Sequence, residues 1–497
     1  YIQIIVIKWF NGAFRYKHGY SFKIIGKMKS VKLFVASIFA AIFVMSCNDE
    51  IAELSESNRI EDKRANTNYR VSIDEAKETL SQFMEMMNGV DLRVSGSNSS
   101  ISHDYSIRNV EVISSNNHQV YTRAGNTSKG IDTLMYIVNF EDNKGFALVA
   151  ADKRTDPIYA IIDEGNFSMD SIDKVDNPGF MLCVERSLKK AAYDIKNYSV
   201  TNNGKMISTS TPGWGGGNPG RKVYPLLSVK WDQSSPYNNC SPYVDGIQTS
   251  NGRGYTGCVI TATAQIISYF RCVGQITYNT NQGNDLNSNH GTATLNWDRI
   301  IADSKSIAND KRYGTLDKDL HHESSYEVAR LMRYLGVALK ADYSNKGTGA
   351  KSEKAIDWLN DWGGLSASGL SDYNGEETVK ALDAKKLVYV RANATKSHTW
   401  IFFNKYSDGH AWVIDGYIEN MTNGNLDRRL VHCNFGWGGQ CDGYYIDGIF
   451  DTGEGTFTWE LEDENDPRNP YTRPDKDKKT RDKLFFRYKV KMSVIGR

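Results

Sequence analysis

The sequence predicts an α+β protein in which a small α+β domain precedes a larger unit with a helical part and an antiparallel sheet part. Apolar residues recur at helical spacing in two separate stretches, 73–87 and 259–270, and the last third of the chain is rich in alternating or continuous apolar strands. At 497 residues the chain exceeds the size at which single cores usually stop growing. Its formal net charge of +1 argues against a polyanion-binding surface, so no nucleic-acid partner is expected.

Residues 28–47 have the form of an export signal. Two lysines follow Met28, an apolar run comes next, and the run ends in "VMSC" at Cys47. The run is too short for a comfortable transmembrane helix. The ending resembles the lipobox of bacterial lipoproteins, which implies acylation of Cys47, a membrane contact only through that lipid, and display at the cell envelope or surface. A plain signal peptide is the alternative, and residues 1–27 are expected to be an upstream extension.

Residues 71–203 are predicted to form the small α+β domain, joined to the export signal by a polar, flexible tether over 48–70. Ser72 and Glu75 make a capping box at the start of its first helix. The expected elements are a helix over 72–87, strands over 134–140 and 145–151, and a helix over 180–196. The domain has no evident catalytic constellation.

A linker is predicted over residues 204–223, where glycine, proline and serine interrupt all periodicity. Exposed linkers of this kind are where proteases cut. Residues 224–497 then form the larger unit. Its expected helices cover 258–270 and 325–335, and its expected strands cover 387–392, 410–418, 429–435, 443–450 and 484–496.

Cys258 is the candidate nucleophile. None of the seven cysteines falls in a CxxC pair or a Cys/His zinc spacing, so neither a metal site nor a cofactor is expected. Cys258 follows a glycine and begins an apolar helix, where unpaired backbone amides and the helix dipole lower a thiol pKa. The dipole supplies only about 0.3 to 1 kcal/mol, less than one pKa unit, so a histidine partner is needed.

His410 is the strongest histidine candidate, because it stands between a glycine turn and a strand, at an edge from which a side chain can reach across a cleft. His432 lies inside a predicted strand and is expected to be packed or at the surface. His398 is similar, and the pair at 321–322 is expected in a surface segment.

Two amide side chains complete the candidate site. Asn434 is suited to accept the Nδ1 proton of a histidine and so to fix its tautomer. Gln233, together with the backbone N–H of Cys258, would form an oxyanion hole for acyl transfer. A lone glutamine or asparagine is usually structural, so the ordered set of four residues carries the prediction.

Four stretches resemble the streptopain-like (C10) cysteine peptidases of the papain-like group: "WDQSSPYN", "TGCVITATAQIISYF", "GHAWVIDGY" and "NFGWGGQCDGYY". The resemblance covers most of residues 224–497 and implies a papain-like fold. It implies that Cys258 is the nucleophile, His410 the general base and acid, Gln233 the oxyanion donor and Asn434 the orienting residue, with Gly409, Gly349 and Trp437 contacting substrate. "YIVNFEDNKGFALVAADKR" resembles the inhibitory propeptide of these enzymes, so 71–203 is expected to be that propeptide and 204–223 the activation linker.

These residues predict an exported zymogen of a cysteine endopeptidase whose partners are protein or peptide substrates and its own propeptide. Loss of the propeptide would separate the peptidase from a lipid on Cys47 and release it. A thiol-dependent cell-wall amidase and a catalytically silent binding protein on the same fold are the alternatives. The family usually has tryptophan where Phe435 stands, which puts in doubt the shielding of the neighbouring Asn434.

Overall fold

A computed structural model describes twelve stretches of the chain, and the elements below belong to them. They are residues 69–86, 105–114, 133–175, 177–197, 199–200, 206–207, 218–280, 290–306, 313–392, 409–422, 425–450 and 490–497. The upstream extension 1–27, the export signal with Cys47 and nearly all of the tether 48–70 lie outside the described residues. No helix within the described stretches is long and apolar enough to cross a membrane.

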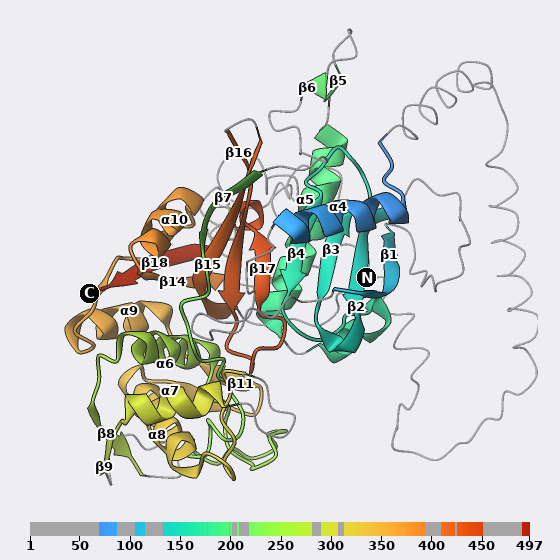
Figure 1. The fold of residues 1–497 in the computed structure, drawn as a ribbon. Coiled ribbons are helices and arrows are strands. Elements are labelled where there is room, and N and C mark those ends of the chain that lie inside the picture. Colours follow the sequence, from blue (N-terminus) through green and yellow to red (C-terminus); the bar gives the residue numbers. More distant parts are fainter. Residues whose placement is uncertain are drawn as a thin grey trace, which may run out of the picture. The chain divides into compact units, whose positions relative to one another are not determined.

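The N-terminal part is an antiparallel sheet with one helix on each face (Figure 1). Its strands are β1 (Ile107–Ser114), β2 (Thr133–Phe140), β3 (Phe146–Ala150) and β4 (Ile158–Ile162), and its helices are α4 (Ile73–Met86) and α5 (Pro178–Asn197). Alternate strand residues reach opposite faces. Tyr136 and Val138 therefore belong to the core under α4, whereas Met135 and Ile137 belong to the core under α5.

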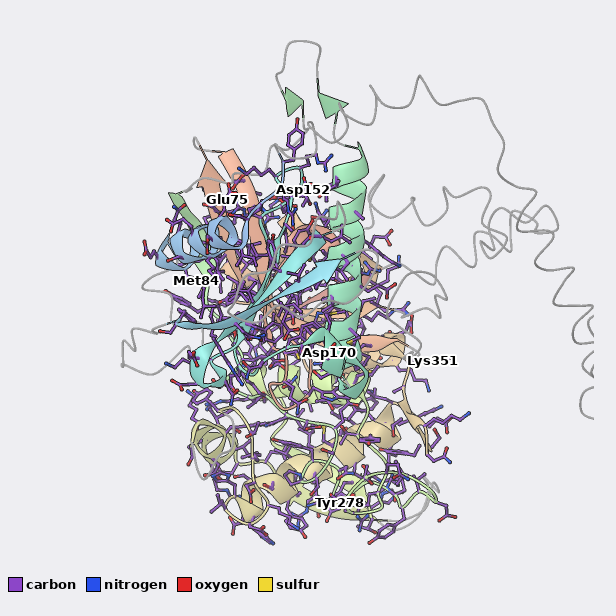
Figure 2. The ribbon with its side chains drawn as sticks, turned by 90° about the vertical axis from the view of Figure 1, so that its right-hand side faces the viewer. Glu75, Met84, Asp152, Asp170, Tyr278 and Lys351 are labelled. Atoms are coloured by element: carbon purple, nitrogen blue, oxygen red, sulfur yellow. The ribbon has the colours of Figure 1, made fainter. Side chains whose placement is uncertain are left out.

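Helix α4 begins as its sequence predicts. The backbone N–H of Glu75 donates to Ser72 Oγ over 3.1 Å, which is the N-cap contact expected from the capping box. Figure 2 shows Glu75 in the first turn of α4 and Met84 near its end. Lys153 pairs with Glu75 over 2.6 Å, so the start of α4 is tied to the turn that follows β3.

The larger unit divides into a helical part and the rest of the sheet. Its helices are α6 (Cys258–Phe270), α7 (Trp297–Lys305), α8 (His322–Ala338), α9 (Ser352–Asp361) and α10 (Gly375–Asp383). Its main strands are β14 (Leu387–Ala392), β15 (His410–Thr422), β16 (Asn425–Asn434), β17 (Gly443–Ile446) and β18 (Lys491–Gly496). Short strands β12 (Ser366–Ala367) and β13 (Ser371–Asp372) pair with β18. Two hairpins, β8 (Gln275–Asn279) with β9 (His290–Thr294) and β10 (Asp342–Ser344) with β11 (Gly347–Gly349), lie in the helical part.

One sheet runs through both parts of the chain, in the order β1-β2-β3-β4-β17-β16-β15-β14-β18-β12. The junction is the antiparallel pairing of β4 with β17, in which Gly443 faces Ile162 and Tyr445 faces Ala160. Gly443 permits this close approach, because a Cβ there would stand 2.5 Å from the backbone oxygen of Ile161. The two predicted domains therefore share a sheet, which the strand patterns alone did not indicate.

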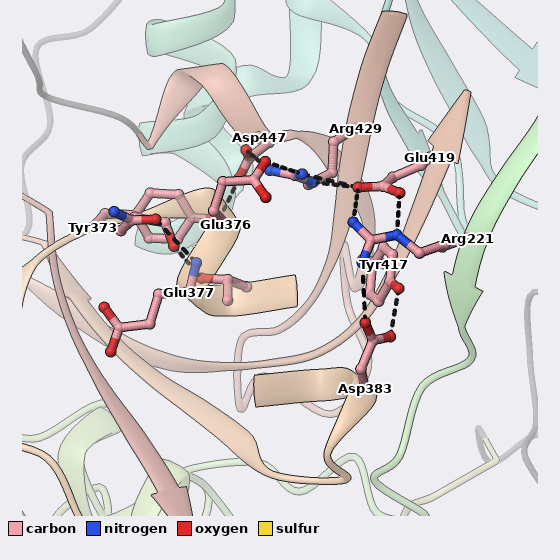
Figure 3. Close-up of polar contacts among 11 residues, drawn as sticks. Arg221, Tyr373, Glu376, Glu377, Asp383, Tyr417, Glu419, Arg429 and Asp447 are labelled. Atoms are coloured by element: carbon pink, nitrogen blue, oxygen red, sulfur yellow. Dashed lines mark hydrogen bonds and ion pairs between the residues drawn. The ribbon is translucent and has the colours of Figure 1, made fainter. Parts of the chain in front are cut away.

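The predicted linker 204–223 needs a correction at its end. Residues Asn218–Val223 form β7, which pairs with β15 of the larger unit. Arg221 of β7 donates to both carboxylate oxygens of Glu419, at 3.0 and 3.1 Å, and lies 3.3 Å from Asp383 (Figure 3). Those ion pairs and the edge of β15 hold this segment, so the linker ends before Asn218.

Two smaller elements also differ from expectation. The predicted strand 443–450 ends at Ile446 and continues as a 3-10 turn, η3 (Asp447–Ile449), where Asp447 ion-pairs with Arg429. The predicted strand 484–496 is described only over its last part, as β18. A short ladder pairs β5 (Ser199–Val200) with β6 (Met206–Ile207), so the first residues of the predicted linker include a strand. The N-terminal part also contains the 3-10 turns η1 (Glu141–Asn143) and η2 (Met169–Lys174).

Candidate active site

Cys258 is the first residue of α6, a helix whose residues from Val259 to Ser268 are all buried. The preceding Gly257 has φ +90°, and a Cβ there would stand 2.8 Å from the backbone oxygen of Thr348. Only glycine fits this backbone without strain. Cys258 itself is half-buried, and desolvation raises the pKa of its thiol, while the backbone N–H groups of Ala411, Val259 and Cys258 oppose that rise. The thiol therefore lies beside the residue that follows His410.

His410 is the first residue of β15 and follows Gly409, whose φ is +108°. Its Nε2 lies 2.9 Å from the backbone oxygen of Phe435. A carbonyl oxygen can only accept, so Nε2 carries the proton and donates it. Burial lowers the pKa of His410 from 6.5 to about 4, partly opposed by this hydrogen bond. His410 is therefore neutral near pH 7, and within the described residues its ring forms no hydrogen bond with the Cys258 thiol.

Aromatic rings enclose the imidazole. Trp412 stacks near it at 6.1 Å and 15°, and Trp437 approaches edge-on at 5.6 Å. Phe435 is fully buried, with its ring centroid 6.2 Å from that of His410. Phenylalanine in place of the family's usual tryptophan therefore still shields this region from water.

Asn434 does not orient His410 in this arrangement, which corrects the role expected from the sequence. Its Oδ1 accepts from Gln265 Nε2 and from the Gly436 backbone N–H, both at 3.1 Å, and its Nδ2 donates to the Val229 oxygen at 2.8 Å. Both acceptor positions of Oδ1 are thus occupied. The next residue binds the histidine instead, through its backbone carbonyl. A backbone carbonyl has no residue signature, so the sequence offered no way to find this contact.

Gln233 lies beside the start of α6, as predicted. Its backbone oxygen accepts from the N–H of Thr256 at 2.9 Å, two residues before Cys258. The side chain is buried, yet its Nε2 has no hydrogen-bond partner among the described residues. Buried amide donors are nearly always paired. An unpaired one at the start of the nucleophile helix is a donor free to bind an added oxygen.

Of the three predicted substrate contacts, Gly349 lies near the start of α6, and Trp437 and Gly409 lie beside His410. Gly349 lies in β11, next to Thr348, whose hydroxyl donates to the Tyr255 oxygen at 2.6 Å. A Cβ at Gly349 would meet no atom within 4 Å, so this position faces open space. Trp437 is half-buried against His410, and Gly409 is the residue before His410 in the chain.

Helix α5 of the N-terminal part lies directly on the histidine. A Cβ at Gly179, in its first turn, would stand 2.7 Å from His410 Cδ2 and 2.4 Å from Phe435 Cδ1. Asn177 anchors this turn: its Oδ1 accepts from the Phe180 N–H at 3.1 Å, and its Nδ2 donates to the Gln440 oxygen at 2.8 Å. The first turn of α5 therefore closes the space over His410.

A buried charge cluster joins the two parts of the chain nearby. Asp163 follows β4 of the N-terminal part, and its Oδ2 lies 3.2 Å from Lys230 Nζ and 3.3 Å from His432 Nε2. His432 Nδ1 lies 2.6 Å from Asp415. These two carboxylates raise the pKa of His432 to about 10 against the desolvation that lowers it, so the ring is charged at neutral pH. His432 was expected to be packed or at the surface; it is packed, and it contacts Asp163 of the N-terminal part.

The charge cluster also reaches the active-site carbonyl. The backbone N–H of Asp163 donates to the Asp442 oxygen at 3.0 Å, and Asp442 Oδ1 accepts from the N–H of Phe435 at 2.9 Å. Phe435 is the residue whose carbonyl holds His410. Burial raises the pKa of Asp442 to about 7.

Comparison with known proteins identifies both parts. Residues 231–445 match the peptidase C10 family, and residues 68–181 match the Spi protease inhibitor family. The chain is 24% identical over 336 residues to streptopain of Streptococcus pyogenes, covering 63% of this chain and 73% of streptopain. It is also 24% identical to the thiol protease/hemagglutinin PrtT of Porphyromonas gingivalis, over 65% of this chain and 35% of PrtT.

Among solved structures, a fragment of Prevotella intermedia prointerpain A is similar to this chain, with 24% identity and a TM-score of 0.42. The alignment covers 64% of this chain and 90% of the fragment. The family matches confirm the predicted cysteine endopeptidase. The matches support a cysteine endopeptidase of the peptidase C10 type over residues 231–445, preceded by an inhibitor-type propeptide domain over residues 68–181.

Proposed function

We propose that this chain is a latent cysteine endopeptidase in which Cys258 is the nucleophile, His410 the general base and acid, and Gln233 the oxyanion donor. The observation that carries the proposal is the contact of α5 with His410, next to a nucleophile helix whose neighbouring Gln233 Nε2 is buried and unpaired. The first feature supports latency. The second supports a site that binds a developing negative charge.

The proposed reaction begins when α5 has left the histidine. His410 takes the Cys258 proton, and the thiolate attacks the carbonyl carbon of a peptide bond. Gln233 Nε2 and the backbone N–H of Cys258 donate to the oxyanion that forms. The imidazolium then protonates the leaving amine, which leaves a thioester on Cys258. Water, deprotonated by His410, attacks that thioester and releases the carboxylic acid and the free thiol.

Latency has a physical explanation in the buried histidine. Covered by α5, His410 has a pKa near 4 and the Cys258 thiol a raised pKa, so the neutral pair is favoured over the reactive thiolate–imidazolium pair. Removal of the propeptide would return water to the ring and restore basicity. Cleavage between residues 201 and 217 would achieve this while leaving β7 on β15.

The test compares the wild-type full chain with Cys258→Ala and with Cys272→Ala, in which a half-buried thiol outside the site is removed. The wild type and Cys272→Ala should shed the propeptide and digest casein, and Cys258→Ala should fold but do neither. Casein digestion by Cys258→Ala would exclude Cys258 as the nucleophile. Maturation of Cys258→Ala without added enzyme would exclude self-processing.

We also propose that the zymogen is exported and acylated at Cys47, so that maturation frees the peptidase from its anchor. This rests on the order of the segments, with Cys47 on the propeptide side of the linker. Mass spectrometry of the matured peptidase from the native host checks it. A matured peptidase still joined to a lipidated N-terminus would contradict release.

A further inference from the structure

Gln265 lies on the nucleophile helix α6, two turns after Cys258, and is completely buried. Its Oε1 accepts from the backbone N–H of Trp231 at 3.0 Å. Its Nε2 donates to Asn434 Oδ1 at 3.1 Å. One carboxamide therefore joins α6 to two segments that are far away in the sequence.

Backbone groups fix the direction of both amides in this network. The Trp231 N–H can only donate, so Gln265 must present its oxygen there and its nitrogen to Asn434. The Val229 oxygen can only accept, so Asn434 must present Nδ2 there and Oδ1 to Gln265. Reversal would cost two hydrogen bonds at Gln265 and three at Asn434. The two amides therefore act as a rigid unit.

Each segment held by Gln265 carries one part of the proposed catalytic machinery. Trp231 is two residues before Gln233, the proposed oxyanion donor. Asn434 precedes Phe435, whose carbonyl holds His410. Helix α6 carries Cys258. The three segments that carry the proposed nucleophile, the His410 support and the proposed oxyanion donor thus meet at one buried side chain. That side chain contacts none of the reacting atoms.

Further close contacts join the same segments around Gln265. The Gly438 N–H donates to the Trp231 oxygen at 3.1 Å, next to the Trp231 N–H that Gln265 accepts. A Cβ at Gly436 would stand 2.9 Å from Thr261 Cγ2 on α6. The loop after β16 therefore cannot move closer to α6 without a clash. The hydrogen bonds of the Gln265 carboxamide fix how the two segments are aligned.

We propose that Gln265 is a positioning residue of the endopeptidase, one that sets the distance and orientation between Cys258, the His410 support and Gln233. The inference rests on the proposed function. It predicts that losing the carboxamide impairs the chemical step far more than substrate binding, because misplacement of catalytic groups by about 1 Å can cost 10²-fold in rate.

The test uses Gln265→Met, which keeps the side-chain length and removes both hydrogen bonds. Gln265→Glu is the second variant, because its carboxylate keeps an acceptor for the Trp231 N–H and loses the donor to Asn434. The matched control is Thr263→Val on the same helix, also fully buried, whose hydroxyl donates only to the Val259 oxygen of its own helix at 2.6 Å. Each full-length chain is matured by a trace of active wild-type enzyme, and a Cys258→Ala chain treated in the same way measures the background.

We expect kcat for a peptide substrate to fall about ten- to a hundredfold in Gln265→Met, with KM changed less than twofold. The kcat of Gln265→Glu should also fall. The kcat of Thr263→Val should stay within twofold of wild type, even if its melting temperature falls as much as that of Gln265→Met. Alkylation of Cys258 by iodoacetamide, which needs no oxyanion donor, should slow less than peptide hydrolysis.

Two results would overturn the inference: a kcat of Gln265→Met and Gln265→Glu within twofold of wild type, or a loss in Thr263→Val as large as theirs. If Gln265→Met does not fold, Gln265→Glu decides by the same criteria. Failure of the proposed function is distinguishable, since then the wild type itself would leave the peptide uncleaved.

Discussion

Gly179 of the propeptide and His410 of the peptidase are in direct contact, so closely that a Cβ at position 179 would stand 2.7 Å from the histidine Cδ2. The first turn of α5 thus covers the imidazole of His410, the proposed general base, with backbone. In the proposed function this contact keeps the zymogen latent, and the predictions below test how the contact is held and what its loss does.

Gly179→Ala should weaken latency. The added Cβ meets two buried rings, those of His410 and Phe435, so the first turn of α5 must withdraw. We expect faster alkylation of Cys258 by iodoacetamide in the uncut full chain, by about tenfold if the contact loses about 1.4 kcal/mol. Lys189→Ala, which removes an i,i+4 ion pair on the same helix, is the control and should change the rate little. Equal rates in wild type and Gly179→Ala would contradict the contact.

Asp163→Asn should destabilise the joint between propeptide and peptidase. It removes the buried carboxylate that faces Lys230 and His432, and breaking a buried ion pair costs about 3 to 5 kcal/mol. Urea unfolding of the uncut Cys258→Ala chain measures the change. Asp170→Asn, at an exposed carboxylate of the same part, is the matched control and should shift the midpoint little.

The coupling between Asp163 and His432 can be measured in the same background. A double-mutant cycle with His432→Gln should show that the two losses are not additive, because the side chains share one buried contact. Additive losses would mean that Asp163 acts on the propeptide alone.

Acid should open the contact over His410. Its pKa is about 4 when covered and 6.5 when free, so the uncovered state binds more protons between these values. Burial of His410 therefore leaves the free energy of unfolding unchanged above pH 6.5. It lowers that free energy as the pH falls, by about 3 kcal/mol at pH 4. The unfolding free energy of Cys258→Ala should therefore fall over this range more steeply than that of Cys258→Ala/His410→Asn. Parallel curves would contradict the buried neutral histidine.

Base should weaken the charge cluster. The pKa of His432 is raised to about 10, so its contribution is fully present below pH 6.5 and is lost as the pH rises through 10. Burial raises the pKa of Asp442 from 3.8 to about 7, so its effect on stability falls between these values and adds little to a decline above pH 7. The melting temperature of the uncut chain should decline from pH 7 to 10, and His432→Gln should flatten that decline.

Gln233→Ala should reduce kcat about 10²- to 10³-fold with little change in KM, since an oxyanion donor acts mainly in the transition state. Removal of an unpaired buried donor costs no hydrogen bond in the resting protein, so stability should be kept or improved. Gln275→Ala, an exposed glutamine on β8, is the control. A rise in KM with kcat unchanged would make Gln233 a substrate-binding residue instead.

Local patterns were sufficient for the elements that carry the site. Helix α6 begins at Cys258 because apolar residues repeat at helical spacing after it and because a glycine precedes it, and β14 matches its predicted range, 387–392. The four candidate site residues were proposed from residue type and order, and their roles remain predictions. Such features depend on neighbours in the chain, which a single sequence contains.

The partner of His410 could not be predicted in the same way. Asn434 has the side chain expected for that role, yet its oxygen is occupied by Gln265 and Gly436, and the carbonyl of Phe435 takes the histidine. Gln265 looked like one more residue of an amphipathic helix. Its role depends on where Trp231 and Asn434 arrive in space.

The sequence by itself was enough to predict a peptidase of the C10 type, the helix that begins at Cys258, the candidate site residues and an inhibitor-type domain ahead of them. The tertiary structure alone decided that β4 joins β17 in one sheet, that α5 covers the histidine, and that Asp163 pairs with both Lys230 and His432. Helical spacing, caps and glycine turns act between residues close in the chain. Sheet edges, backbone acceptors and buried charges take their partners from distant segments, and those pairings are selected only when the whole core closes and water is excluded.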